Sequence, residues 1–566
     1  MSHKGMARNI TVGLSVLMGI GVFLFWNTAY PHALSYQEQY QLFLWTGDYL
    51  RERGGVPGGV ADWLGEFIVQ FYRIEWLGAL LLALLFVALQ QVVRMVTGFG
   101  LPSFVPSVLL FWLLGDPSVL LGYVMALIIA ISSAGIMGYI GRKAERTRIA
   151  KIIGKWGDIL IVPIIYWVVG PLAWVYVLLR IVGYAQKEGW RNGWKLGWIA
   201  VYLAVLQVVA YHFLLTQWQA EAVMLPMQYY RIPLMMNGLM WGIPLVIIIL
   251  AGLSTFKKDF WQTSRTRRTS IVAPVIQAIE ILGLAALTWA AISKGYDKDM
   301  YELIRQDYLV RNERWDEIVK RAQEYQVKTP FWSNCVNLAL AQKRQLADRM
   351  FDFYQSGEDA LLMPRVRDLT SMLPTAEAFW RLGMVNSAQR YMFDTQESIL
   401  NGRKSGRCTQ RIAECMLVNG HYRTATKQLN LLKKTLFYRE WAQEAEALLG
   451  QEEKINAHPV YGKLRRLRYK EDFLYSYEEM DKMLGLLFMN NPENKMALDY
   501  FMGEMLLKGN LQGFQQYMGA VQQYGGYRMM PIGYQDAMRC IQMQGNVPGS
   551  PYANYAKRMM AGRRDS

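Results

Sequence analysis

Long apolar runs are the feature that most restricts how this chain can fold. They lie almost entirely in residues 1–294 of the 566, whereas residues 295–566 are polar and hold no run long enough to cross a bilayer. A helix needs about 20 mostly apolar residues to span the hydrocarbon core. The sequence therefore predicts an all-α protein, with a polytopic helical membrane domain at 1–294 and a soluble domain at 295–566.

Seven apolar stretches are each predicted to form one membrane span. They lie at about 9–29, 76–97, 101–115, 118–140, 195–216, 237–254 and 270–293. The first has no small-residue cleavage site and is too long for the apolar core of a signal peptide, so we expect it to be retained. An eighth stretch, 158–185, is long for one helix and short for two, and Gly170-Pro171 lies in its middle.

Basic loops decide between the two interpretations of 158–185. The loops 141–155 and 256–270 are both strongly basic, and loops of this kind remain in the cytoplasm. A single span at 158–185 would place the second loop outside, whereas a hairpin broken at Gly170-Pro171 keeps both inside. We therefore predict about nine spans in a bacterial inner (cytoplasmic) membrane. Residues 30–75 then lie on the outer face, and the soluble domain is periplasmic.

The distribution of charge indicates what the chain binds. Residues 1–294 hold 23 of the 61 Lys and Arg but 13 of the 45 Asp and Glu, so most of the net charge of +16 lies in the membrane domain. Basic residues beside spans attract anionic head groups, which predicts membrane lipid as a partner. No basic patch interleaved with aromatics occurs in the soluble part, so nucleic acid is not an expected partner.

The soluble domain shows helix-length segments separated by short turns. Residues 415–449 and 491–521 each indicate a helix, a glycine turn and a second helix, with the turns at Gly420 and Gly509. The pattern is typical of an α-solenoid, and it resembles a degenerate tetratricopeptide repeat. Protein interaction is the function such a domain suggests. All four cysteines lie in this part, and Cys408 and Cys415 are spaced for contact, although buried free thiols are the favoured interpretation.

The loop at 30–75 is the most informative part of the membrane domain. We expect one helix over 35–52, a turn in "RGGVPGG" and a second helix over 60–73. The first carries Glu38 and Asp48. The second has a polar face formed by Asp62, Glu66, Gln70 and Arg73. Both are predicted to lie flat on the outer membrane surface as interfacial helices.

This arrangement resembles the membrane glycosyltransferases of the GT-C superfamily. The resemblance runs through Glu38 in "YQEQYQLFLWTGDYL", the turn Pro57-Gly58-Gly59, "WLGEFIVQFYR" and the span "EWLGALLLALLFVAL". It implies transfer of a sugar from a polyprenyl-phosphate donor. An acid just after the first span would then serve as general base or as ligand to a divalent metal. By position Glu38 is that acid, Asp48 is a weaker second candidate, and Glu66 is a candidate for substrate binding.

Other features of the chain leave alternatives open. Gln39 follows Glu38 where many members of the superfamily have a second acid, and the loop holds no Asp-x-Asp, so no metal ligands are assigned. Arg231, beside Tyr229 and Tyr230, is a candidate contact for a lipid phosphate, or else an anchor in an aromatic belt. The whole chain also resembles a family of multi-pass membrane proteins from Bacteroidota, which implies no activity. The alternative function is a non-catalytic scaffold whose helical domain recruits a protein partner in the cell envelope.

Overall fold

The structure is a computed structural model that describes residues 3–143, 148–189, 196–216, 238–263, 269–366, 370–399, 402–469, 477–543 and 547–562. Within these ranges the chain is helical and contains no strand. Its internal contacts divide it into two compact units, Met1–Lys298 and Asp299–Ser566. We call them the membrane unit and the helical unit. The division falls just after the boundary expected at 294.

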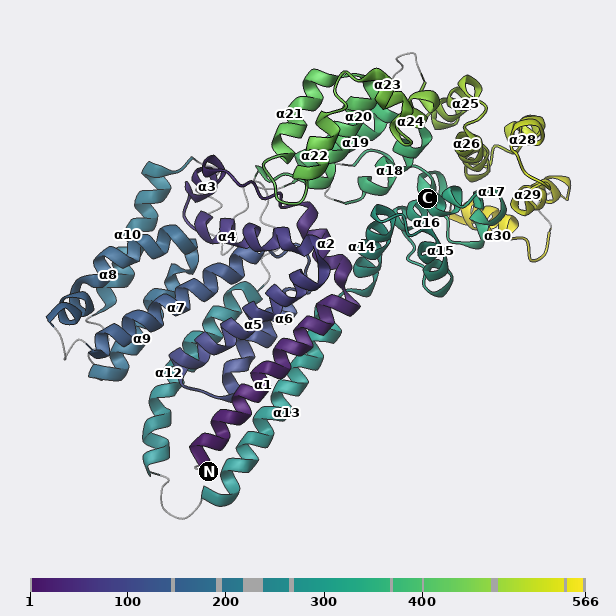
Figure 1. Cartoon of the computed structure of the whole chain (residues 1–566). Helices are drawn as coiled ribbons and strands as arrows, with labels where there is room; N and C mark the ends of the chain where they lie inside the picture. The colour runs from purple at the N-terminus through teal and green to yellow at the C-terminus, as the bar shows by residue number, and fades with distance from the viewer. Residues whose placement is uncertain are drawn as a thin grey trace. The chain divides into compact units, whose positions relative to one another are not determined.

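The membrane unit consists of long helices linked by short helical segments (Figure 1). Its α-helices are α1 (His3–Leu24), α2 (Pro31–Gln39), α3 (Gly47–Gly54), α4 (Gly59–Val69), α5 (Glu75–Thr97), α6 (Val105–Leu113), α7 (Leu121–Lys143), α8 (Arg148–Val169), α9 (Ala173–Glu188), α10 (Gly197–Val209), α12 (Leu239–Thr263) and α13 (Thr269–Gly295).

Six stretches of the described chain are long and apolar enough to cross a membrane. They are Thr11–Ala29, Glu75–Thr97, Leu121–Ile140, Gly157–Lys187, Gly197–Leu214 and Val275–Gly295. Two further apolar helices, Leu101–Leu113 and Leu239–Ser254, are shorter. This count differs from the nine predicted spans because 157–187 is taken as one stretch and the two shorter helices are set apart.

The chain reverses direction inside 157–187. Asp158 on α8 and Arg180 on α9 are 22 positions apart, yet their side chains are 2.8 Å apart. A continuous helix would separate them by about 33 Å. The turn lies at Gly170–Leu172, where Gly170 has a φ of 61°, a conformation that glycine adopts without a steric penalty. The two helices therefore form a hairpin.

Contacts show how the two shorter apolar helices run. The segment that leads into α6 begins at Gly100, beside Thr11 at the start of the first long apolar stretch. After α6, the backbone oxygen of Val119 accepts a hydrogen bond of 3.2 Å from Gln37 of α2. The segment that contains α6 therefore extends along the same length of the membrane unit as the apolar part of α1. In the same way α12 runs from beside the start of α7, where Tyr123 bonds to the Met240 backbone, to beside the end of α9 at Gln186.

The predicted helix over 35–52 is broken in two. Helix α2 begins at Pro31 and ends at Gln39, and α3 begins at Gly47, where Thr46 caps it by accepting a hydrogen bond from the Tyr49 backbone. The residues between them are not helical. Phe43 in this segment inserts its ring among those of Tyr49, Trp63 and Phe67, with ring centroids 5.3 to 5.6 Å away. Burial of this ring outweighs the local preference for one continuous helix.

The helical unit contains seventeen α-helices in its described part. They are α14 (Lys298–Arg311), α15 (Trp315–Glu324), α16 (Pro330–Gln342), α17 (Leu346–Arg349), α18 (Met372–Leu382), α19 (Val385–Ser398), α20 (Gly406–Asn419), α21 (Tyr422–Leu432), α22 (Arg439–Glu446), α23 (Glu452–Ala457), α24 (Tyr461–Leu467), α25 (Met480–Asn490), α26 (Lys495–Lys508), α27 (Leu511–Gln516), α28 (Met518–Tyr524), α29 (Ile532–Gln542) and α30 (Pro551–Gly562).

Successive helices of this unit pack against one another. Helices α18 to α22 each contact the next along the chain, and Figure 1 shows them in green. The turns expected at Gly420 and Gly509 are present, and both glycines have a positive φ. After the second turn Tyr517 packs edge-on against Phe501 of α26, with ring centroids 4.9 Å apart. All four cysteines are buried and free.

Candidate functional site

Helix α4 carries its polar residues inward and its apolar residues outward. Asp62, Glu66 and Gln70 are buried, whereas Trp63 and Phe67 are half-buried. Of the four residues predicted to form the polar face of an interfacial helix, three are therefore buried and Arg73 alone is exposed. The reason is that α4 packs directly on α7: a Cβ added to Gly65 would lie 2.4 Å from the backbone nitrogen of Gly122. Glycines allow the two backbones to approach closely, and the polar face lies against this contact.

A buried charged centre joins α3 to α4. The Tyr49 hydroxyl donates a hydrogen bond to the Glu66 carboxylate, and Arg53 Nε lies 3.4 Å from the same oxygen. The Arg53 guanidinium also lies over the Tyr49 ring, 5.2 Å from its centroid. Glu66 is 0% exposed and Arg53 is buried with it. Each charge in this centre thus has an opposite charge or a hydrogen bond to offset its loss of hydration.

The environment of this centre fixes its protonation. Burial raises the pKa of the Tyr49 hydroxyl, and the neighbouring Glu66 carboxylate raises this pKa further. For Arg53 burial alone would lower the pKa, but the Glu66 carboxylate outweighs burial and the pKa is raised. Tyr49 is therefore neutral and Arg53 charged at every physiological pH. The centre acts as a fixed ion pair, and Glu66, predicted to bind substrate, is one of its members.

The turn between α3 and α4 is held by the tip of the α8–α9 hairpin. The indole nitrogen of Trp167 donates to the Gly54 oxygen, and the Gly58 nitrogen donates to the Trp167 oxygen, both at 2.8 Å. Gly58 has a φ of 86°, a value that favours glycine. The Pro57-Gly58-Gly59 motif therefore has a structural role, since it docks the loop onto the hairpin.

Glu38 is the predicted catalytic acid, and the structure places it inside the protein. It lies in the last turn of α2, and the residue is 5% exposed. Its neighbour Gln37 ties this helix to the segment before α7 through the oxygens of Pro117 and Val119. The carboxylate is thus held in a fixed, largely water-free position in the loop between the first two long apolar stretches.

The remaining predicted residues do not join Glu38. Asp48 has a side chain that is 90% exposed, and it pairs with Arg51 on the surface of α3 at 3.1 Å. Arg231, Tyr229 and Tyr230 lie outside the described residues. Within the part of the chain that the structure describes, no group of three or more His, Cys, Asp or Glu residues could hold a metal ion.

A second buried charged centre was not predicted from the sequence. Arg180 donates two hydrogen bonds to Asp158, from Nε at 3.1 Å and from Nη2 at 2.8 Å, and the Tyr176 hydroxyl donates a third. All three side chains are buried. A signal was present, because Asp158 and Arg180 are charged residues in an apolar stretch and lie almost symmetrically about Gly170-Pro171. Intramembrane charges usually pair or carry a function.

Comparison with known proteins places the chain in a family. No curated protein and no solved structure matches it. One family model matches residues 7–559, which is nearly the whole chain and includes both units. The chain therefore belongs to the family of unknown function DUF6057.

Proposed function

We propose that this protein is a multi-pass protein of the bacterial inner membrane that transfers a sugar from a polyprenyl-phosphate donor at the outer face. The observation that carries the proposal is the position of Glu38, a buried carboxylate in the loop between the first two long apolar stretches. The sequence resemblance assigns the catalytic acid to this place. A GT-C-type enzyme of this kind needs one base and a site for the lipid phosphate.

The proposed chemistry uses Glu38 as general base. A Glu38 oxygen takes the proton of the acceptor hydroxyl while the hydroxyl oxygen forms a bond to the anomeric carbon. The bond between that carbon and the lipid phosphate breaks, and its electron pair leaves with the phosphate oxygen. Arg231, with Tyr229 and Tyr230 beside it, is the proposed contact for this phosphate. No step of the proposal requires a divalent metal.

Nine crossings with an outward-facing helical unit are part of the proposal. This topology is supported by the reversal of the chain at Gly170–Leu172. It is also supported by contacts which indicate that α6 and α12 each run from one end of the membrane unit to the other. The hairpin tip also bonds to the turn after α3, so it lies on the same side as residues 30–75. A reporter active only in the periplasm, fused after residue 566, should be active, and a cytoplasmic reporter at the same place should be silent.

The test of the enzymatic proposal is the substitution Glu38→Gln in a strain that lacks the native gene. Loss of a general base lowers a rate by about 100-fold to 10,000-fold. We expect wild type and Asp48→Asn to restore the same glycolipid or glycan profile and Glu38→Gln to fail at equal membrane abundance. An unchanged profile with Glu38→Gln would remove Glu38 as the base and the enzymatic proposal with it.

A scaffold is the second candidate function. It is favoured by three strongly exposed apolar side chains of the helical unit, Met489 (71%), Met529 (82%) and Ile532 (71%). Contiguous exposed apolar groups are typical of surfaces that bind another protein, and Met529 and Ile532 lie three positions apart in the sequence. If the scaffold function is the correct one, the double variant Met529→Asp/Ile532→Asp should abolish complementation while Glu38→Gln retains it. The enzymatic proposal predicts the opposite pattern.

A further inference from the structure

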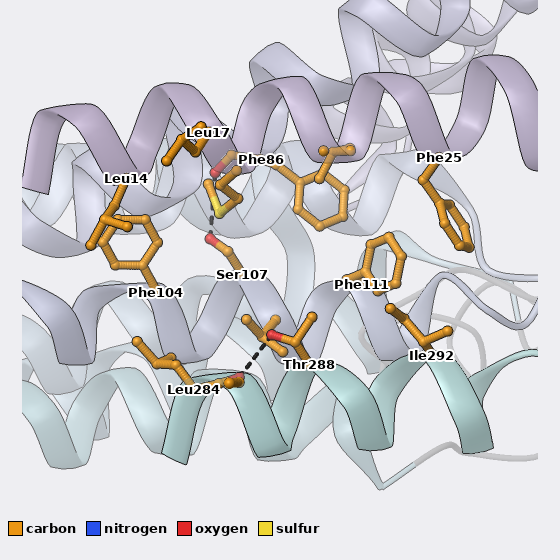
Figure 2. Close-up of a pocket in the computed structure, with 15 residues that line it drawn as sticks. Leu14, Leu17, Phe25, Phe86, Phe104, Ser107, Phe111, Leu284, Thr288 and Ile292 are labelled. Carbon is orange, nitrogen blue, oxygen red and sulfur yellow. Dashed lines mark hydrogen bonds between the residues drawn. The ribbon is translucent and has the colours of Figure 1, made fainter. Parts of the chain in front are cut away.

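A groove of about 430 Å³ lies between α1, α5, α6 and α13 of the membrane unit. Figure 2 shows the side chains of α1 and α13 directed into one space from two sides, with those of α6 between them. The groove is separate from Glu38, which does not line it. The residues that define it best are Leu17, Gly21, Phe25, Phe86, Phe111 and Leu284.

The lining offers no free polar group to a ligand. The Ser107 hydroxyl donates to the backbone oxygen of Phe86 at 3.4 Å, and the Thr288 hydroxyl donates to that of Leu284 at 2.8 Å. The remaining lining side chains are apolar. A ligand in this groove can therefore gain dispersion contacts but no directed hydrogen bond. The groove therefore favours a hydrocarbon chain as its ligand.

The groove is continuous with the lipid-facing surface of the protein. Only 17% of the residues in the apolar window on α1 and 6% of those on α13 are buried, so the rest of the described protein leaves much of both helices uncovered. We expect a hydrocarbon chain of the bilayer to fill an apolar space beside it. If the space were empty, the side chains that line it would lose van der Waals contacts.

The dimensions of the groove fit one lipid chain. From Leu14 to Phe25 it follows α1 for about 16 Å. One leaflet contributes half of the hydrocarbon core, about 15 Å. At the Phe25 end three rings pack together: Phe25 lies 4.7 Å from Phe111 and 4.9 Å from Tyr296, and the Tyr296 hydroxyl bonds to the Phe111 backbone.

We propose that this groove binds a single acyl chain of a bilayer phospholipid, held between α1 and α13 with its end against the Phe25–Phe111–Tyr296 cluster. The site is distinct from the acidic site at Glu38. Its occupant is a structural lipid that completes the packing of α1 and α13, and it is not the sugar donor. The proposal therefore stands or falls independently of the proposed function.

A glycine in the groove wall provides a direct test. No heavy atom lies within 4 Å of a Cβ added to Gly21, so Gly21→Phe places a ring in the groove without displacing the backbone. Gly283 on α13 is equally open and is exposed, and it lies on the face of α13 opposite to Ala285 and Ile292. Gly283→Phe is therefore the matched control, since it adds the same ring to a groove helix outside the groove.

The measurement is native mass spectrometry of the full-length protein released from detergent. We expect wild type and Gly283→Phe to retain one phospholipid and Gly21→Phe to lose at least nine-tenths of that occupancy at an unchanged elution volume. The proposal would be overturned if wild type carried no phospholipid, or if Gly21→Phe kept its phospholipid. It would also be overturned if wild type formed a dimer that Gly21→Phe abolishes and carried no lipid.

A second measurement covers the case in which Gly21→Phe fails to fold. The wild-type protein is placed in phosphatidylethanolamine vesicles whose acyl chains carry a photoactivatable diazirine, and the labelled peptides are mapped. Labelling should concentrate at least fivefold on Met18 and Phe111 relative to the exposed apolar residues of α10. Equal labelling of the groove and α10 would contradict the proposal.

Discussion

Asp158 and Arg180 form a buried, doubly hydrogen-bonded ion pair across the turn of the α8–α9 hairpin, although 22 positions separate them in the sequence. The pair fixes the two helices in register, because both hydrogen bonds require the guanidinium and carboxylate planes to align. Tyr176 adds a third bond to the same carboxylate. The hairpin tip in turn holds the loop that carries the Tyr49–Arg53–Glu66 centre through Trp167.

The first prediction concerns this ion pair. Asp158→Asn leaves the Arg180 charge buried without its partner, which typically costs about 3–5 kcal/mol. We expect a large loss of thermal stability in detergent, read as the temperature at which the monodisperse peak disappears on size exclusion. The double variant Asp158→Leu/Arg180→Leu should recover part of the loss. Arg51→Ala, which breaks an exposed pair, is the control and should change little. Equal stability of Asp158→Asn and wild type would contradict the assigned role.

The second prediction concerns the contact between α4 and α7. Gly65→Ala should destabilise the membrane unit by about 1–3 kcal/mol or more, because its Cβ would lie 2.4 Å from backbone that has little freedom to move. Gly138→Ala on α7 meets nothing within 4 Å, so there the better helix propensity of alanine should leave stability unchanged or raised. The same heating assay compares the two variants. A less stable Gly138→Ala than Gly65→Ala would show that close packing is not the reason for Gly65.

The third prediction ranks substitutions in the Tyr49–Arg53–Glu66 centre. Arg53→Met should be the most damaging, since it removes the charge that offsets the buried Glu66 carboxylate, at a cost of several kcal/mol. Tyr49→Phe removes one hydrogen bond to a charged group and should cost about 1.5–3 kcal/mol. Denaturation of the purified full-length protein measures both. If Tyr49→Phe were the more damaging variant, the ion pair would not be the main contribution of this centre to the stability of the protein.

The fourth prediction concerns the pH dependence of the helical unit. Burial raises the pKa of Glu504 from 4.5 to about 7, opposed by Lys508 and assisted by Glu358 and Asp481. Burial likewise raises the pKa of Asp499 to about 6. The folded state then binds these protons more tightly than the unfolded state. The stability contributed by Glu504 is complete below pH 4.5 and is lost as the pH rises through about 7. The stability contributed by Asp499 is complete below pH 3.8 and is lost as the pH rises through about 6.

For Glu504 this contribution is about 3 kcal/mol. Hydrogen exchange of α26 in the full-length protein, measured between pH 5 and 8 and corrected for the intrinsic exchange rate, should show falling protection as the pH rises. Glu504→Gln cannot ionise, so its protection should vary less with pH. An identical pH dependence in the two proteins would exclude Glu504 as the source.

Local patterns in the sequence predicted much of the architecture. The length of the apolar runs predicted the long helices of the membrane unit, and the absence of such runs after 294 predicted the second unit. The turns at Gly420 and Gly509, and the reversal at Gly170-Pro171, are encoded by residues that tolerate or favour those backbone conformations. These features depend on neighbours in the sequence, which is why a single chain reveals them.

The tertiary structure alone decided where the polar groups of the loop point. Glu66 has the spacing of a solvated helix face, yet it is buried against Arg53 because α4 packs on α7 through Gly65. Burial of the Phe43 ring interrupts a helix that the neighbouring residues would otherwise continue. The pairing of Asp158 with Arg180 likewise follows from the hairpin, since their symmetric placement in the apolar stretch becomes a contact only when the chain reverses. The sequence by itself determined which segments are helical and apolar. Packing between distant segments decided which of their faces is buried. Burial depends on contacts between residues far apart in the chain, and the local spacing of apolar residues does not encode these contacts.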